Sequence, residues 1–485
     1  MYKKTEIYFI IILSFAIHFT KAQNPLSLYY LENIPQSTLL NPAMTPRTNF
    51  YLGIPGVNTI YTSINTNMTS GILQEQSNGQ YLIVGQEGFD YSILYKDIGD
   101  AANITSYQTI TPLMFGFKTK NGYFTFSWTE KLNEEISAPK DIFRIMDEGY
   151  TEGSQYDFSK TGSDAKYYRE ISFGYSFNLS KHLRFGLHTK FLQGLVAFKS
   201  NINNITVNTS SENWDVTMNG SVHLSAPVYI SSYDENGFPI IDSIPSDMSD
   251  LIDKGILNFS NPGFAVDLGM VYSKNKFELS VSLNDLGFIM WKGNDLHNYY
   301  ADGSYSFNSL NEDSIDDGLG ELIDSIRTAV NLTHDDAKFN TGLGPKIYIG
   351  TRYKFNHYFS MGFLSRTVLT RYVTRQDFNV SANLNLYHIL TTSVNYTMSI
   401  NGRNSLGTGI GLRLGPLQLY TAMDFVPYNI SKNITIANPS DPEYPTQIPV
   451  MPDKLSRFNI MLGVNLLFGA NGYHDKPMIE PSPKF

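Results

Sequence analysis

Strict alternation of apolar and polar residues over segments of about ten residues is the feature that most constrains the fold of this chain. In residues 458–468 an apolar side chain occupies every second position. The same period recurs in residues 171–179, 377–387 and 390–400. A period of two is typical of β-strands whose two faces meet different surroundings. We therefore predict an all-β protein.

The predicted strands are long, and their connections are uneven. Strands of soluble sheets average roughly five or six residues, whereas about ten residues are needed for a tilted strand to cross the bilayer hydrocarbon. Short turns such as 120–122 and 356–357 alternate mainly with long polar connections, as in transmembrane β-barrels. A soluble sandwich or propeller also alternates, but strand length, turn asymmetry and the lack of a fixed repeat disfavour both.

The alternation predicts sixteen strands, and an even number places both chain ends on the periplasmic side. The predicted strands are 50–65, 105–119, 122–131, 166–179, 183–199, 201–209, 213–226, 262–273, 276–290, 339–355, 357–374, 376–387, 389–400, 404–414, 416–426 and 457–468.

The first 22 residues read as an export signal. Lys3 and Lys4 precede an apolar run of 13 residues, Ile7–Phe19, and Ala22 offers a small residue for cleavage. This run is too short for a membrane-spanning helix. We predict a signal peptide (1–22), an N-terminal segment (23–48), a barrel (49–468) and a polar C-terminal tail (469–485). Export without any cysteine fits a protein of the bacterial outer membrane.

Charge and cysteine content exclude several functions. The predicted signal holds three lysines and one glutamate, so the remaining chain has 33 basic and 44 acidic side chains, a net charge of −11. Such a balance argues against nucleic acid as a partner. The acidic excess lies in segments 227–260 and 294–338, which we expect to be loops that face outward. Zero cysteines exclude disulfides, thiolate metal sites, a cysteine nucleophile and a lipid-anchored N-terminal cysteine.

Three short motifs carry a family resemblance. The stretch Asn41-Pro42-Ala43, just before the first strand, is similar to the N-terminal signature of long-chain fatty-acid-transporter-like barrels. Relatives of those barrels in the Bacteroidota include the barrels associated with type IX secretion. Residues 49–61 (NFYLGIPGVNTIY) and 283–293 (LNDLGFIMWKG) resemble a family of uncharacterised outer-membrane barrels of that phylum.

The resemblance implies a 14-stranded barrel whose N-terminal segment, residues 23–48, forms a hatch in the lumen. Our count of sixteen departs from it, unless 201–209 and 213–226 form one insertion.

A second departure is the C-terminus. Outer-membrane barrels commonly end on an aromatic residue that resembles the recognition signal of the barrel-assembly machinery. Here either Phe468 or the terminal Phe485 would serve.

The inward face of the predicted barrel is small and polar. Gly407, Gly409 and Gly411 share one face of a strand and provide either room for a hatch or substrate, or strand curvature. Charged and ionisable residues predicted to point into the lumen form either an internal network that braces it or a selectivity filter. These residues are Arg184, His188, Lys190, Asp267, Glu278, Lys346, Arg352, Lys354, Asp377, Arg413 and Asp424.

The long connections contain three predicted helices. Residues 312–330 place apolar side chains on one face after a capping box at 309–312, and 246–256 and 139–148 are weaker candidates. These helices would cover the barrel or bind a partner, or simply fold the loops.

Signatures of catalysis are missing from the sequence. It has no nucleophile elbow, no His-Glu-x-x-His and no phosphate or dinucleotide loop, and the acidic pairs 316–317 and 335–336 lack calcium-loop spacing. We therefore expect no catalytic residue, metal or cofactor.

The expected function is an outer-membrane transport barrel for a small hydrophobic molecule, inserted in outer-membrane lipid by the assembly machinery. The alternatives are a non-transporting barrel that partners an envelope or secretion complex and, with no local support, an outer-membrane enzyme.

Overall fold

The computed structural model describes residues 25–68, 73–77, 79–83, 86, 88–95, 98–243, 260–293, 295–308, 330–386, 389–400, 404–424, 430–436, 446–452 and 457–469. The predicted signal, the predicted helix 246–256, the predicted helix 312–330 apart from Val330, and the tail beyond Gly469 lie outside these residues.

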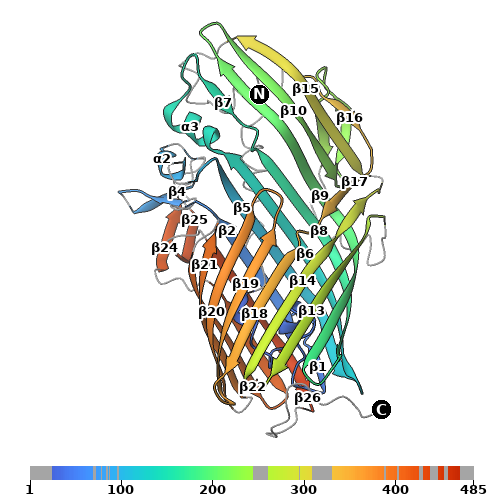
Figure 1. Cartoon of the computed structure of the whole chain (residues 1–485). Coiled ribbons are helices and arrows are strands. Elements are labelled where there is room, and N and C mark those ends of the chain that lie inside the picture. The colour runs from blue at the N-terminus through green and yellow to red at the C-terminus, as the bar shows by residue number, and fades with distance from the viewer. Residues whose placement is uncertain are drawn as a thin grey trace.

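Fourteen antiparallel strand positions form a closed ring (Figure 1). The first position is divided into β1 and β2, and both parts pair with β26, which closes the ring. In ring order the positions are β1 (Phe50–Gly53) with β2 (Thr59–Thr66), β5 (Ala101–Lys118), β6 (Gly122–Pro139), β8 (Gly162–Asn178), β9 (Leu183–Thr209), β13 (Pro262–Lys274), β14 (Phe277–Trp291), β17 (Phe339–Gly342) with β18 (Lys346–Lys354), β19 (Phe359–Leu369), β20 (Thr374–Leu386), β21 (Leu390–Ile400), β22 (Ser405–Leu414), β23 (Leu417–Met423) and β26 (Arg457–Phe468).

Alternation along each strand separates an apolar outer face from a polar inner face. On β21, Val394 and Met398 are more than half exposed on the outside, whereas Ser393, Asn395 and Thr397 are buried inside. The closed ring pairs the backbone of each wall strand, so the outer face can meet lipid hydrocarbon without an open edge. No helix in the described part of the chain is long and apolar enough to span a bilayer.

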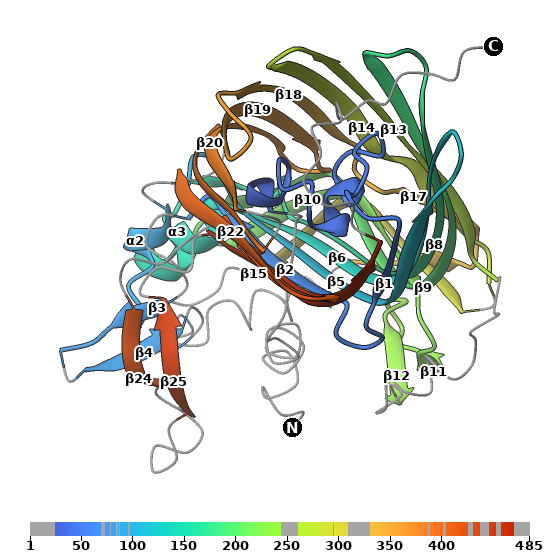
Figure 2. The same ribbon diagram turned by 90° about the horizontal axis from the view of Figure 1, so that it is seen from below.

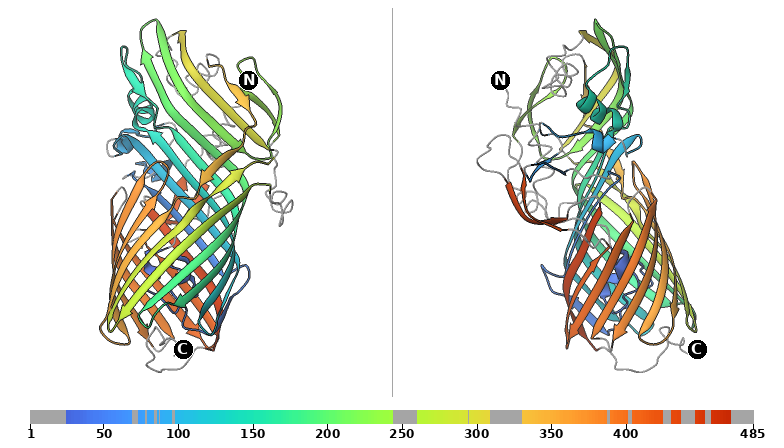
Figure 3. Two further views of the ribbon diagram at one scale, coloured as in Figure 1. Left: turned by 45° about the vertical axis from the view of Figure 1, so that its right-hand side comes forward. Right: turned by 90° about the vertical axis from the view of Figure 1, so that its left-hand side faces the viewer.

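The two ends of the barrel differ. At one end, here called the turn end, strands are joined by tight turns such as 179–182 and 415–416, and both β1 and the end of β26 lie there. At the other, the loop end, β6, β8 and β9 continue past the rest of the wall (Figure 3). β10 (Asn213–Ser225) and β15 (Leu296–Asn308) extend this sheet, which we call the extension.

The extension corrects our count of sixteen strands. Residues 201–209 are the continuation of β9, a single strand of 27 residues, and the predicted strand 213–226 corresponds to β10 (Asn213–Ser225), which lies outside the ring. The alternation carried no mark of where the wall ends, because these residues keep the strand period beyond it. Segment 294–338 was expected to be a loop but contains β15.

Smaller elements lie around the loop end (Figure 2). The predicted helix at 139–148 is confirmed as α3 (Lys140–Glu148), which begins after Pro139. The others are α2 (Ser92–Tyr95), the hairpin β11 (Tyr229–Tyr233) and β12 (Pro239–Ser243), the sheet of β3 (Leu73–Glu75), β4 (Gln80–Ile83), β24 (Ile430–Ile436) and β25 (Thr446–Pro452), and the short strands β7 (Gln155–Asp157) and β16 (Thr333–Asp335).

Candidate functional site

Residues 25–48 lie inside the ring at the turn end and are called the plug here (Figure 2). The plug contains two short 3₁₀ helices, Leu26–Leu28 and Pro35–Leu39. Its apolar residues, including Leu28, Tyr29 and Ile34, form one buried cluster with inward side chains of the wall such as Tyr348 and Tyr420. The plug therefore supplies the hydrophobic core of a lumen whose wall is mostly polar inside.

The plug is held by side chains and not by strand pairing. The Asp424 carboxylate accepts hydrogen bonds from the backbone N–H groups of Leu26 (2.6 Å) and Ser27 (2.9 Å). On the facing wall Ser282 donates to the carbonyl of Leu40 at 2.8 Å. Gln418 donates to the carbonyl of Asn33 at 2.9 Å. Hydrogen bonds between backbone groups of residues 25–44 stay within the plug.

The Asn41-Pro42-Ala43 motif is a tight turn pressed against the wall. The Asn41 side chain accepts a hydrogen bond from the backbone N–H of Ala43 at 2.9 Å, as asparagine does in Asx turns. A Cβ atom added at Gly186 would lie 2.2 Å from the Pro42 carbonyl carbon, and one at Gly269 would lie 2.2 Å from the Asn41 side chain. The motif therefore needs glycine on two neighbouring strands, β9 and β13.

The glycine stripe of β22 also receives the plug. A Cβ atom at Gly409 would lie 2.7 Å from Leu31, and one at Gly411 would lie 3.0 Å from Ile34. Gly407 faces Asn395 and Asp424 of the wall instead. Two of these three glycines thus make room for the plug.

An ion cluster joins the plug to two strands. Arg352 of β18 contacts Glu32 of the plug and lies 2.7 Å from Glu278 of β14. Arg47 lies 3.3 Å from Glu32, and Lys354 lies 3.4 Å from Glu278. Burial raises the pKa of Glu32, but the neighbouring Arg352, Lys354 and Arg47 outweigh burial and hold the pKa below its ordinary value of 4.5. Glu32 is therefore ionised at neutral pH.

Next to the plug, towards the loop end, seven ionisable side chains from six adjacent strands form a charge network. They are Lys131, Glu170, His188, Lys190, Asp267, Asp285 and Lys346. Lys190 lies 2.7 Å from Asp267 and 2.6 Å from Asp285. Three lysines balance three carboxylates, which favours a bracing role over a selectivity filter.

The structure brings most of the predicted lumen residues together. Arg184 contacts Thr45 of the plug, and Asp377 pairs with Arg366 at 2.6 Å further along the lumen. Arg413 is separate, because it lies at the turn end and donates to the carbonyl of Gly415 at 2.9 Å. Tyr123 of β6 is buried on the inner face of the barrel and stacks on Tyr51.

Sequence reasoning missed Asp285, which bonds Lys190 and Lys346. Its backbone φ is +59°, a conformation that Asp and Asn adopt more readily than most residues. The register between β13 and β14 shifts beside it. The polar pair Asn284-Asp285 interrupts an alternating strand, and that interruption was the available signal.

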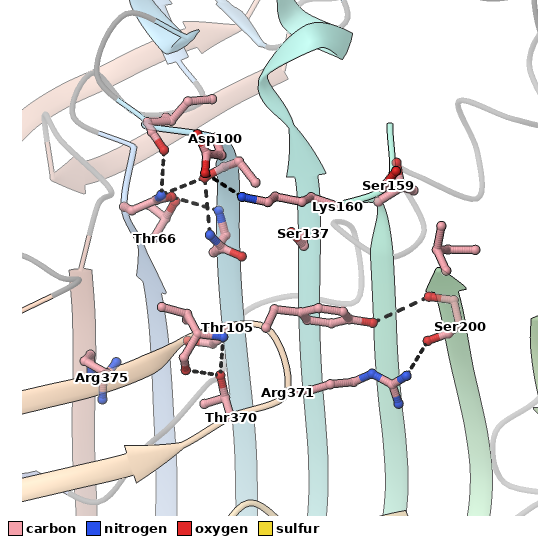
Figure 4. A pocket seen from close by; sticks show the side chains of 18 of the residues that line it. Thr66, Asp100, Thr105, Ser137, Ser159, Lys160, Ser200, Thr370, Arg371 and Arg375 are labelled. Carbon is pink, nitrogen blue, oxygen red and sulfur yellow. Dashed lines mark hydrogen bonds and ion pairs between the residues drawn. The ribbon is translucent and has the colours of Figure 1, made fainter. Parts of the chain in front are cut away.

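At the loop end a cavity of about 590 Å³ opens in the barrel mouth (Figure 4). It is lined by the outer ends of β2, β5, β6 and β9 and by the connection Thr370–Val373, called the strap here. Arg371 of the strap donates to the carbonyl of Ser200 at 2.7 Å and lies 3.5 Å from Asp164, while its backbone N–H donates to Glu135 at 2.8 Å. The strap thus reaches from β19 and β20 to the wall formed by β6, β8 and β9.

Fold and lumen together define a plugged transmembrane β-barrel with a cavity at its loop end. The described residues contain no group of three or more His, Asp or Glu side chains suited to a metal. The chain belongs to a family described as "Family of unknown function (DUF5723)", whose profile matches residues 42–424.

Comparison with solved structures found similar barrels. The toluene transporter TbuX of Ralstonia pickettii is 9% identical, with 89% of this chain and 93% of that chain covered and a TM-score of 0.38. The toluene transporter TodX of Pseudomonas putida is 10% identical, with 90% and 95% covered and a TM-score of 0.38. A FadL homologue of Pseudomonas aeruginosa is 10% identical, with 90% and 94% covered and a TM-score of 0.36. A search of the curated proteins found no match.

Proposed function

We propose that the protein is a transport barrel of the bacterial outer membrane that opens when the plug moves. The observation that supports this most is that the plug packs inside the lumen as a buried cluster without belonging to the sheet. Its contacts with the wall are made through side chains such as Asp424, Ser282 and Gln418. The plug can therefore leave its seat without breaking a single strand pair of the wall.

The location is part of the proposal. A closed ring with an apolar outer face suits a bilayer, and the export signal predicted at residues 1–22 leads to the bacterial envelope. Membrane fractionation should recover the chain in the outer membrane, and its gel mobility should change on heating, as is typical of folded barrels. Recovery in the soluble periplasm would contradict the location.

The test of transport compares the intact chain with a variant lacking residues 25–46. In planar bilayers we expect the intact chain to be mostly closed and the variant to show large, stepwise conductance. Gly342→Ala is the control, because an added Cβ atom there meets no atom within 4 Å. A deletion variant that is folded by heat-modifiable mobility and still does not conduct would overturn the proposal.

The cargo predicted from the family resemblance is a small hydrophobic molecule. Liposome uptake of toluene and of a long-chain fatty acid tests it directly. Apolar side chains at the loop end, such as Phe89, Leu94 and Phe143, are packed in a buried cluster of their own. The cavity at the loop end has a different lining, in which side chains with an amide or hydroxyl predominate.

A second function, a non-transporting barrel that partners an envelope complex, is favoured by the extension. β9 and β10 extend on one side of the mouth and offer a large surface beyond the apolar outer face of the ring, which we call the apolar belt (Figure 1). Transport does not require such a surface. Chemical cross-linking through lysines introduced on the extension, followed by mass spectrometry, should then recover one envelope protein in stoichiometric amount. An enzymatic function has no support in the described residues.

A further inference from the structure

The lining of the cavity indicates what it binds. Of its 21 lining residues, 13 carry a side-chain amide or hydroxyl, and only four are aliphatic. Its volume of about 590 Å³ lies within the roughly 300–1,000 Å³ typical of small-molecule sites. We propose that this cavity binds a neutral, polyhydroxylated ligand of the size of a short oligosaccharide.

The floor of the cavity holds buried polar groups that an apolar ligand would leave unpaired. Asn65 is only 8% exposed, and its amide nitrogen donates to Ser63 at 2.6 Å. Its carbonyl oxygen has no hydrogen-bond partner among the described residues. Thr105 and Ser137 line the same cavity and are 7% and 5% exposed. Desolvating such groups without a partner is costly, so a hydrophobic ligand is disfavoured.

Charged ligands fit less well than neutral ones. The three cations of the lining are each bonded to a carboxylate: Lys160 to Asp100, Arg371 to Asp164, and Arg375 to Asp377. An anion would have to compete with these carboxylates for the three cations. A cation would find only Asp100 in the lining, and Lys160 lies 2.5 Å from it. Figure 4 shows the Asp100–Lys160 pair on the side of the cavity opposite Arg371 and Arg375.

Hydroxyl groups complement what remains. A hydroxyl donates one hydrogen bond and accepts two, so the several hydroxyls of such a ligand can pair with donors and acceptors of the lining alike, including the hydroxyls of Thr105 and Ser137. Tyr372 adds an aromatic ring to the lining, fixed by the contact of its hydroxyl with Ser200 at 3.5 Å. A ligand with several adjacent hydroxyls therefore forms more hydrogen bonds with the polar groups of this lining than a hydrocarbon ligand does.

The inference rests on the proposed transport function and replaces the hydrophobic cargo expected from the family resemblance with a neutral, polyhydroxylated one. Binding can be tested apart from transport. Full-length protein in a detergent without a sugar headgroup would be studied by saturation-transfer NMR. The probes are maltotriose, cellotriose, xylotriose and mannotriose, with a galacturonic acid trimer, a glucosamine trimer and a long-chain fatty acid as comparisons. At least one neutral trisaccharide should give saturation transfer.

Variants decide whether the signal comes from the cavity. Asn65→Leu and the isosteric Thr105→Val should each weaken binding by about tenfold, the effect of one lost hydrogen bond to a buried group. Asn208→Leu, an exposed asparagine of the extension, should leave it unchanged. Thr105→Val keeps the test valid if Asn65→Leu does not fold.

Three outcomes would overturn the inference. No neutral trisaccharide binds, or both cavity variants bind it as tightly as the parent protein does, or the cavity substitutions change the binding of only the charged trimers or the fatty acid. Liposome swelling with the bound trisaccharide then tests the proposed function separately. Binding without uptake, in the deletion variant that conducts, would leave the ligand site standing and contradict its role in transport.

Discussion

The plug limits the size of single side chains on the wall. Gly186 is the clearest case, because a Cβ atom there would lie 2.2 Å from the backbone of Pro42. Gly186→Ala should cost about 1–3 kcal/mol of unfolding free energy, as expected of overpacking, and raise the open probability in bilayers. Gly342→Ala should change neither. Equal behaviour of the two variants in urea titrations and conductance recordings would contradict this seat for the plug.

Glu32 makes the plug sensitive to pH. Its folded-state pKa is depressed by Arg352, Lys354 and Arg47 against the effect of burial, so its contribution to plug binding is fully present above its ordinary pKa of 4.5. That contribution is lost as the pH falls from 4.5 through the folded-state pKa. Channel openings should therefore increase below about pH 4.5 in bilayer recordings.

Glu32→Gln provides the matching variant. It removes the carboxylate that pairs with Arg352, so it should open more often at neutral pH and respond less to acid. Asp335→Asn removes another carboxylate of lowered pKa, held by the backbone N–H of Ala337 far from the plug. That control should keep the full acid response. An acid response equal in all three proteins would place the sensor elsewhere.

At the scale of elements, the strap is the most distinctive connection. Arg371→Ala would remove its bonds to Ser200 and Asp164, and we expect a loss of about 1–3 kcal/mol of stability. Hydrogen exchange should rise in residues 370–373 and in the outer part of β9. Arg413→Ala, which removes an arginine bonded to a turn carbonyl, should stay within about 0.5 kcal/mol of the parent.

The elements also show what alternation can and cannot predict. Strands such as β20 and β21 were predicted within two residues, because both faces of each obey one pattern over its whole length. β15 was missed because polar residues and tyrosines occupy both of its faces. The division of the first strand at residues 54–58 was missed too, since IPGVN keeps enough apolar residues to continue the pattern.

The site was less predictable than the fold because its interacting residues lie far apart in the sequence. Leu26 and Asp424, or Glu32 and Arg352, meet across more than 300 residues of sequence, so no local spacing indicates the pairs. The asparagine-containing stretches 65–67 and 200–203 line the cavity, and neither was singled out from the sequence. Amides that recur on the same inward face at strand ends were the signal available.

The whole molecule is divided into an apolar belt and an extension beyond it. Val394, in the middle of β21, is 57% exposed on the outer face of the belt. Val394→Arg should cost roughly 2–4 kcal/mol of folding free energy in lipid vesicles, as for cations at the bilayer midplane. Asn208→Arg on the extension should be nearly neutral. A similar cost at both sites would mean that the belt and extension share one environment.

The join between the first and last strands has a consequence for biogenesis. The plug leads directly into β1, and Thr48 and Asn49 both bond the carbonyl of Phe468, the last residue of β26. β1 and β2 pair with no strand on that side until β26 has been delivered. The plug is therefore secured in part by the last strand, so closure of the ring and the final fixing of the plug are coupled. A nascent chain truncated before Arg457 would lack both, which makes completion of the last strand a checkpoint against an unsealed pore.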